Sequence, residues 1–74
     1  VSCSIKNERL VLEFDDVRFV YIKGSSYEPS STFFVKNEDF YGRGDISAEE
    51  KEIALKAIDA FNNKSNWQIV IIDD

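Results

Sequence analysis

Paired carboxylates are the residues of this sequence best suited to acid–base chemistry. Asp15 and Asp16 follow the first apolar segment, and Glu38 and Asp39 lie in a polar segment further along. Two carboxylates can act as general acid and general base only where a pocket shifts the pKa of one of them. A chain of 74 residues can hardly enclose such a pocket. We therefore expect these acids to be solvated and the protein to have no enzymatic activity.

The remaining side chains also argue against catalysis and metal binding. No histidine is present, so the usual general base near neutral pH is missing. Cys3 is the only cysteine, which rules out an internal disulfide, and we expect it to be a small apolar residue. The acidic pairs lack the alternating oxygen ligands and central glycine of a calcium loop. We expect neither a metal nor a cofactor.

The charge balance indicates which partners suit the chain. It has 14 acidic and 9 basic residues, a net charge of -5. This balance disfavours direct binding to nucleic acid or to anionic lipid, because both are recognised by clustered Lys and Arg. It suits a basic protein partner, and it equally suits solubility alone. The longest apolar run, residues 69–72, is too short to span a membrane. With no signal-peptide pattern and one cysteine, we expect a cytoplasmic location.

Hydrophobic periodicity predicts one α+β domain over residues 1–74. Strands are expected within 4–14, with a turn at residues 7–8, and over 17–22, 32–36 and 67–72. The order strand, strand, strand, helix, strand favours a small antiparallel sheet with one amphipathic helix on one face. The last strand is apolar on both faces, so we expect it inside the sheet. Residues 24–31 and 37–45 are expected to be loops.

The helix has a clear start signal. Ser47 and Glu50 have the spacing of a capping box. Residues 53, 54, 57, 58 and 61 form an apolar stripe, and residues 62–63 are expected to end the helix. Just before the start stands Arg43-Gly44-Asp45, a tripeptide also known as a cell-adhesion ligand. An acid at this position is favoured by the helix dipole, so we interpret the segment as the start of a helix.

Acids and aromatics in the expected turns and loops are the candidates for an interface. Tyrosine is a frequent anchor at protein interfaces, and an acidic rim would suit a basic partner. The alternative is that the loop aromatics pack in the core and the acids are ordinary surface residues. The candidates are Asp15, Asp16, Glu38, Asp39, Tyr41 and Arg43.

The segment "ISAEEKEIALKAIDAF" (46–61) followed by "WQIVII" (67–72) resembles the tail of small bacterial immunity proteins. These belong to contact-dependent inhibition and other polymorphic toxin systems. The resemblance implies a short antiparallel sheet before a capped helix and a closing strand. It also implies a protein that binds and neutralises one cognate toxin domain, commonly a nuclease. Two alternatives stay open: a small adaptor or regulatory module, and a homo-oligomer in which strand edges pair between chains.

Overall fold

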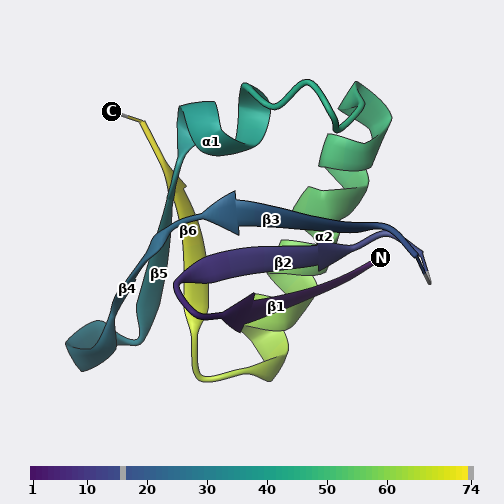
Figure 1. Ribbon diagram of the computed structural model, residues 1–74. Coiled ribbons are helices and arrows are strands. Elements are labelled where there is room, and N and C mark those ends of the chain that lie inside the picture. The colour runs from purple at the N-terminus through teal and green to yellow at the C-terminus, as the bar shows by residue number, and fades with distance from the viewer. Residues whose placement is uncertain (16, 74) are drawn as a thin grey trace.

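The chain folds into two small sheets and one long helix (Figure 1). The computed structural model describes residues 1–15 and 17–73. The elements are β1 (Ser2–Lys6), β2 (Arg9–Glu13), β3 (Phe19–Lys23), β4 (Ser25–Tyr27), the 3-10 helix η1 (Glu28–Ser30), β5 (Thr32–Lys36), α1 (Asn37–Tyr41), α2 (Ala48–Lys64) and β6 (Gln68–Ile72). The predicted α+β class is confirmed.

Sheet A consists of β1, β2 and β3 in that order, with both pairs antiparallel. The β1–β2 turn has two residues, Asn7 and Glu8, with φ angles of 50° and 64°. Such positive φ angles match the twist of a tight hairpin. Alternation along β2 places Leu10 and Leu12 on the inner face, where both are fully buried. The predicted turn and the predicted strands on either side of it are confirmed, and Val11, on the other face of β2, is buried as well.

One residue, Gly24, turns the chain from sheet A into sheet B. It joins β3 to β4, and its amide donates to the Glu8 carbonyl at 3.3 Å. A Cβ atom at this position would lie 2.4 and 2.5 Å from two ring carbons of the fully buried Phe33. Glycine is therefore required for the strand to pass this close to the core. The prediction of a loop over residues 24–31 is wrong, because β4 and η1 occupy most of it.

Sheet B consists of β4, β5 and β6, with β5 in the middle. The β4–β5 pair is antiparallel, whereas β5 and β6 are parallel. The chain passes through two helices after β5, so it can return in the same direction. Two expectations are wrong here: the strands are not all antiparallel, and β6 is an edge strand. Its apolar residues on both faces therefore do not reflect a central place in a sheet.

The polar segment after β5 is partly helical, which corrects the prediction of a loop over residues 37–45. Glu38 and Asp39 lie in the first turn of α1, where acids are favoured by the helix dipole. Phe40 is fully buried and anchors α1 to the core. The helix ends at Gly42, whose amide donates to the Glu38 carbonyl at 3.0 Å.

The start of α2 confirms the predicted capping box. Ser47 Oγ accepts from the Glu50 amide at 3.1 Å, and the Ser47 amide donates to Glu50 Oε1 at 3.0 Å. Ala54 and Ile58 are buried, but Ile53 is 47% exposed, although the predicted stripe included it. The helix also continues to Lys64, past its predicted end.

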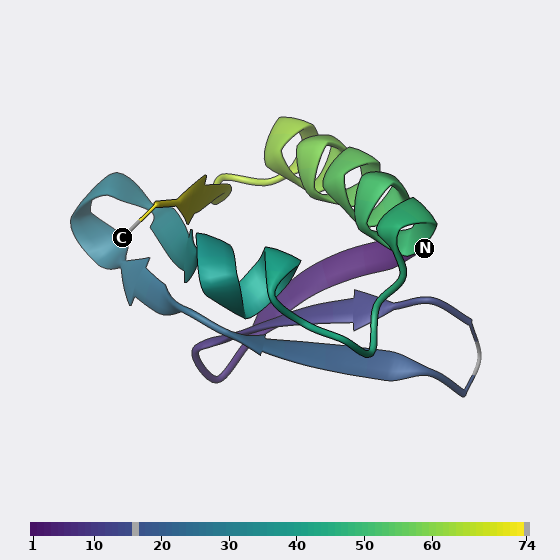
Figure 2. The ribbon, with the colours of Figure 1, turned by 90° about the horizontal axis from the view of Figure 1, so that it is seen from above.

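The core lies between α2 and the inner faces of the sheets. Seen from above, α2 lies over sheet A, with α1 and sheet B toward one end (Figure 2). Neither α-helix in the described part of the chain is long and apolar enough to cross a membrane. The buried cluster comprises Leu10, Leu12, Val20, Ile22, Phe33, Val35, Phe40, Ile46, Ala54, Ile58 and Ile69.

Candidate protein-binding surface at the edge of strand β6

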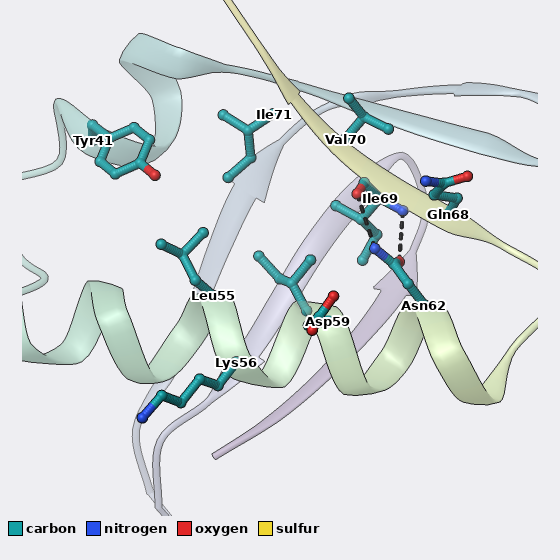
Figure 3. A pocket seen from close by; sticks show the side chains of 10 residues that line it. Tyr41, Leu55, Lys56, Asp59, Asn62, Gln68, Ile69, Val70 and Ile71 are labelled. Atoms are coloured by element: carbon teal, nitrogen blue, oxygen red, sulfur yellow. Dashed lines mark hydrogen bonds between the residues drawn. The ribbon is translucent and has the colours of Figure 1, made fainter.

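The outer edge of β6 is closed at one point by a side chain from α2. The Gln68 amide donates to Ser31 next to β5, so the main-chain groups of Ile69 point to the opposite edge. There the Ile69 amide donates to Asn62 Oδ1 at 2.7 Å, and Asn62 Nδ2 donates to the Ile69 carbonyl at 3.1 Å. Both bonds are drawn in Figure 3. Asn62 lies inside α2, which continues to Lys64, so it does not end the helix as predicted.

A groove of about 510 Å³ lies between α2 and β6. Figure 3 shows Tyr41 at one end of it and Asn62 at the other, with Leu55 and Ile71 between them. We call it the β6 groove. Its lining residues are Tyr41, Leu55, Lys56, Ile58, Asp59, Asn62, Gln68, Ile69, Val70 and Ile71.

Tyr41 is held at the end of the groove by its neighbours. Its ring meets the buried Phe40 ring edge-on, with centroids 4.9 Å apart and planes at 90°. Its carbonyl accepts from Lys51 Nζ at 2.8 Å. The side chain is nevertheless 45% exposed. A large aromatic ring that is fixed at its base and exposed at its surface suits contact with a partner.

Three acids surround the C-terminal end of β6. Glu38 and Asp39 line a hollow beside Ile72, and the exposed Asp73 follows in the chain. None of the three forms an ion pair with the described residues. The hollow also contains two lysines, Lys23 and Lys36. Of the predicted residues, Glu38 and Asp39 therefore line this hollow, whereas Tyr41, from the same helix α1, lines the separate β6 groove.

A second exposed apolar surface lies on the outer face of sheet A and carries the opposite charge. Phe19 and Tyr21 are 45% and 52% exposed on β3. Beside them three cations stand directly opposite one another across the strands: Lys6, Arg9 and Lys23. This row would repel a basic partner. Its Lys23 also lines the hollow beside Ile72, so the two surfaces meet at this residue.

Arg43 serves a structural purpose, which does not support its choice as an interface residue. Its guanidinium donates two hydrogen bonds of 2.9 Å to the Asp45 carboxylate and one of 2.8 Å to the Tyr21 carbonyl. The hydrogen bond from Arg43 lowers the pKa of Asp45. The arginine and acid of the Arg43-Gly44-Asp45 tripeptide therefore bind each other and tie the α1–α2 connection to β3.

A second arginine ties the β2–β3 hairpin to the start of α2. Arg18 donates to the Glu50 carboxylate and to the Asp45 carbonyl, and its guanidinium carbon lies 4.9 Å from the Phe14 ring centroid. The hydrogen bond from Arg18 lowers the pKa of Glu50. Glu50 thus serves both the capping box and this ion pair, a double role that spacing in the sequence did not reveal.

Asp15 lies away from the β6 groove. Its carboxylate accepts from the amides of Val17 (2.9 Å) and Arg18 (2.8 Å), which shapes the β2–β3 connection. Both ribbon views place that connection at the opposite end of the molecule from sheet B (Figures 1 and 2). Asp16 lies outside the described residues.

Cys3 is half-buried on β1, and burial raises its pKa to about 12. A thiol with so high a pKa stays protonated at neutral pH and is a poor nucleophile. This agrees with the expectation of a small apolar residue.

Sequence reasoning missed the wall of the groove, including Asn62, Leu55 and Ile71. A last strand inside the sheet, as the sequence predicts, would have no open edge and no groove beside it. No protein-family model, curated protein or solved structure matches this chain.

Proposed function

We propose that this domain binds a partner protein at the edge of β6 and thereby acts as an immunity protein that neutralises a toxin domain. The observation that carries the proposal is the position of β6. It is an edge strand with apolar residues on both faces, and a groove runs beside it. Exposed apolar edges invite association, so proteins usually protect them. A dedicated partner that covers the edge would explain its composition.

The expected partner is basic, and a nuclease fits this description. Glu38, Asp39 and Asp73 supply carboxylates without ion-pair partners among the described residues, and the chain has a net charge of -5. Opposite fields speed the encounter of two proteins. The carboxylates of the inhibitor would also occupy the nuclease surface that binds the phosphates of nucleic acid, and would thereby compete with the substrate. The resemblance of residues 46–72 to immunity proteins points the same way, and a cytoplasmic location would suit this role.

Co-expression with the protein encoded beside this chain in its genome tests the function. We expect the neighbour alone to be toxic and the pair to co-purify as a harmless complex. A dissociation constant in the nanomolar range or below would fit inhibition. Micromolar binding without rescue from toxicity would favour the adaptor or regulatory alternative. A harmless neighbour that forms no complex would refute the proposal.

A charge reversal tests the assignment of the surface. Glu38→Lys should slow association on the order of tenfold at low salt and reduce its dependence on salt. Glu28→Lys is the matched control, because it makes the same charge change in η1, at the far end of sheet B (Figure 1). Association rates measured by stopped flow should change only for the first variant. Equal effects of both variants would mean that net charge, not this surface, steers the partner.

A further inference from the structure

Asn62 pairs with Ile69 as the next strand of a sheet would. Its side-chain amide accepts from the Ile69 amide and donates to the Ile69 carbonyl, at 2.7 and 3.1 Å. A neighbouring strand makes the same kind of contact through its peptide groups. The side chain therefore closes sheet B at residue 69 and no further.

Beyond that point the edge is open. Strand alternation turns the amide and carbonyl of Ile71 to the same edge as those of Ile69, and neither has a partner in the described part of the chain. The β6 groove runs beside them, with Leu55 and Ile58 in its wall. An extended peptide needs free main-chain groups for affinity and pockets for alternate side chains for specificity. This edge offers both.

We infer that the partner contributes an extended segment that lengthens sheet B at Ile71; this inference rests on the proposed function. The Asn62 amide keeps its bonds to Ile69, and the partner's segment begins beyond it, where it bonds to the amide and carbonyl of Ile71. One of its apolar side chains enters the groove between Leu55 and Tyr41. A lysine or arginine of the segment lies near Asp73, where the strand ends in acids.

Charge favours a different protein over a second copy of this chain. Each copy of this chain has a net charge of -5, so two copies paired through β6 would repel each other. A basic segment from a partner meets no such repulsion.

Amide hydrogen exchange, measured by NMR, tests the inference on the unmodified protein. In the free chain the Ile71 amide should exchange rapidly, whereas the Val70 amide, which points toward β5, should be protected. In the complex with the neighbouring gene product, protection of Ile71 should rise at least about a hundredfold, while that of Val70 changes little. Unchanged exchange at Ile71 in a tight complex would overturn the inference and leave the proposed function standing. Absence of any complex would overturn both.

Self-association is checked by the same measurement on the free chain. Protection of Ile71 that rises with the protein's own concentration would show that a second copy occupies the edge, and the inference would be wrong. We expect no such dependence on concentration.

A chemical variant provides the second arm. The chain is short enough for total synthesis with an N-methyl group on Ile71, which removes the donor and blocks the edge but keeps the side chain. Binding to the partner should weaken at least about tenfold. N-methylation of Asn66, whose amide has no partner among the described residues, is the control and should leave binding unchanged. Equal affinities for both variants would overturn the inference.

Discussion

The sharpest prediction concerns Gly24, which joins the two sheets. In the variant Gly24→Ala, the new methyl group would lie 2.4 and 2.5 Å from Cε1 and Cζ of Phe33 and 2.8 Å from the Phe34 carbonyl oxygen. Carbon atoms in contact normally stand about 3.5–4.0 Å apart, so the ring must move by about 1 Å. Phe33 is fully buried and has little room to do so.

The expected loss is large for so small a protein. Overpacking a core typically costs about 1–3 kcal/mol, and a clash with both a ring and the main chain belongs at the upper end. At about 0.05–0.15 kcal/mol per residue, the whole domain is stable by only about 4–11 kcal/mol. We therefore expect Gly24→Ala to lower the free energy of unfolding by about 3 kcal/mol and the Tm by more than about 10 °C.

Urea denaturation, followed by Trp67 fluorescence and far-UV circular dichroism, measures the change. Gly44→Ala is the matched control, because a Cβ atom there would meet no other atom within 4 Å. It should be neutral or stabilise by up to about 1 kcal/mol. Adding Phe33→Leu to Gly24→Ala removes the clashing ring, so the double variant should lose less stability than the sum of the single variants. A Gly24→Ala protein within about 0.5 kcal/mol of the parent would refute the reasoning.

Two further predictions concern the polar contacts of α2. The pKa of Glu50 is lowered by the hydrogen bond from Arg18, so the stability from this pair is present above the unfolded pKa of about 4.3 and is lost as the pH falls through the folded value. Glu50→Gln keeps a capping-box residue but removes the charge. Its free energy of unfolding should therefore be lower than that of the parent at pH 7 and equal to it in acid, and a difference independent of pH would contradict this. Asn62→Leu should lower the free energy of unfolding by about 2 kcal/mol, because it leaves the amide and carbonyl of Ile69 without hydrogen-bond partners. Thermal unfolding of the exposed neighbour variant Asn63→Leu, which should stay near the parent, checks that the loss comes from these two bonds.

Local signals in the sequence predicted local structure well. The capping box of Ser47 and Glu50 forms as expected, since both residues lie within one turn of the chain. Leu10 and Leu12 are buried on one face of β2 because alternation depends only on the extended backbone. The α+β class follows from the same periodicities.

Part of the candidate surface was also predictable. Glu38, Asp39 and Tyr41 are polar or aromatic residues of a segment expected to be a loop, and α1 places them near the C-terminal end of β6. For Arg43 the structure shows an intramolecular role, because Asp45 and the Tyr21 carbonyl accept hydrogen bonds from its guanidinium. Nothing in the spacing of Arg43 and Asp45 shows whether the two side chains face each other or a partner.

The place of β6 in the sheet was decided only by the tertiary structure. Residues 69–72 are apolar on both faces. Such a run indicates that both faces contact apolar groups, but it does not identify the residues that supply those groups. A corner at Gly24, a parallel return after two helices and one amide from Asn62 together make it an edge strand beside a groove. Each of these depends on contacts between residues far apart in the chain. The sequence by itself determined the elements and their apolar faces, whereas long-range packing determined which edge of the sheet remained open.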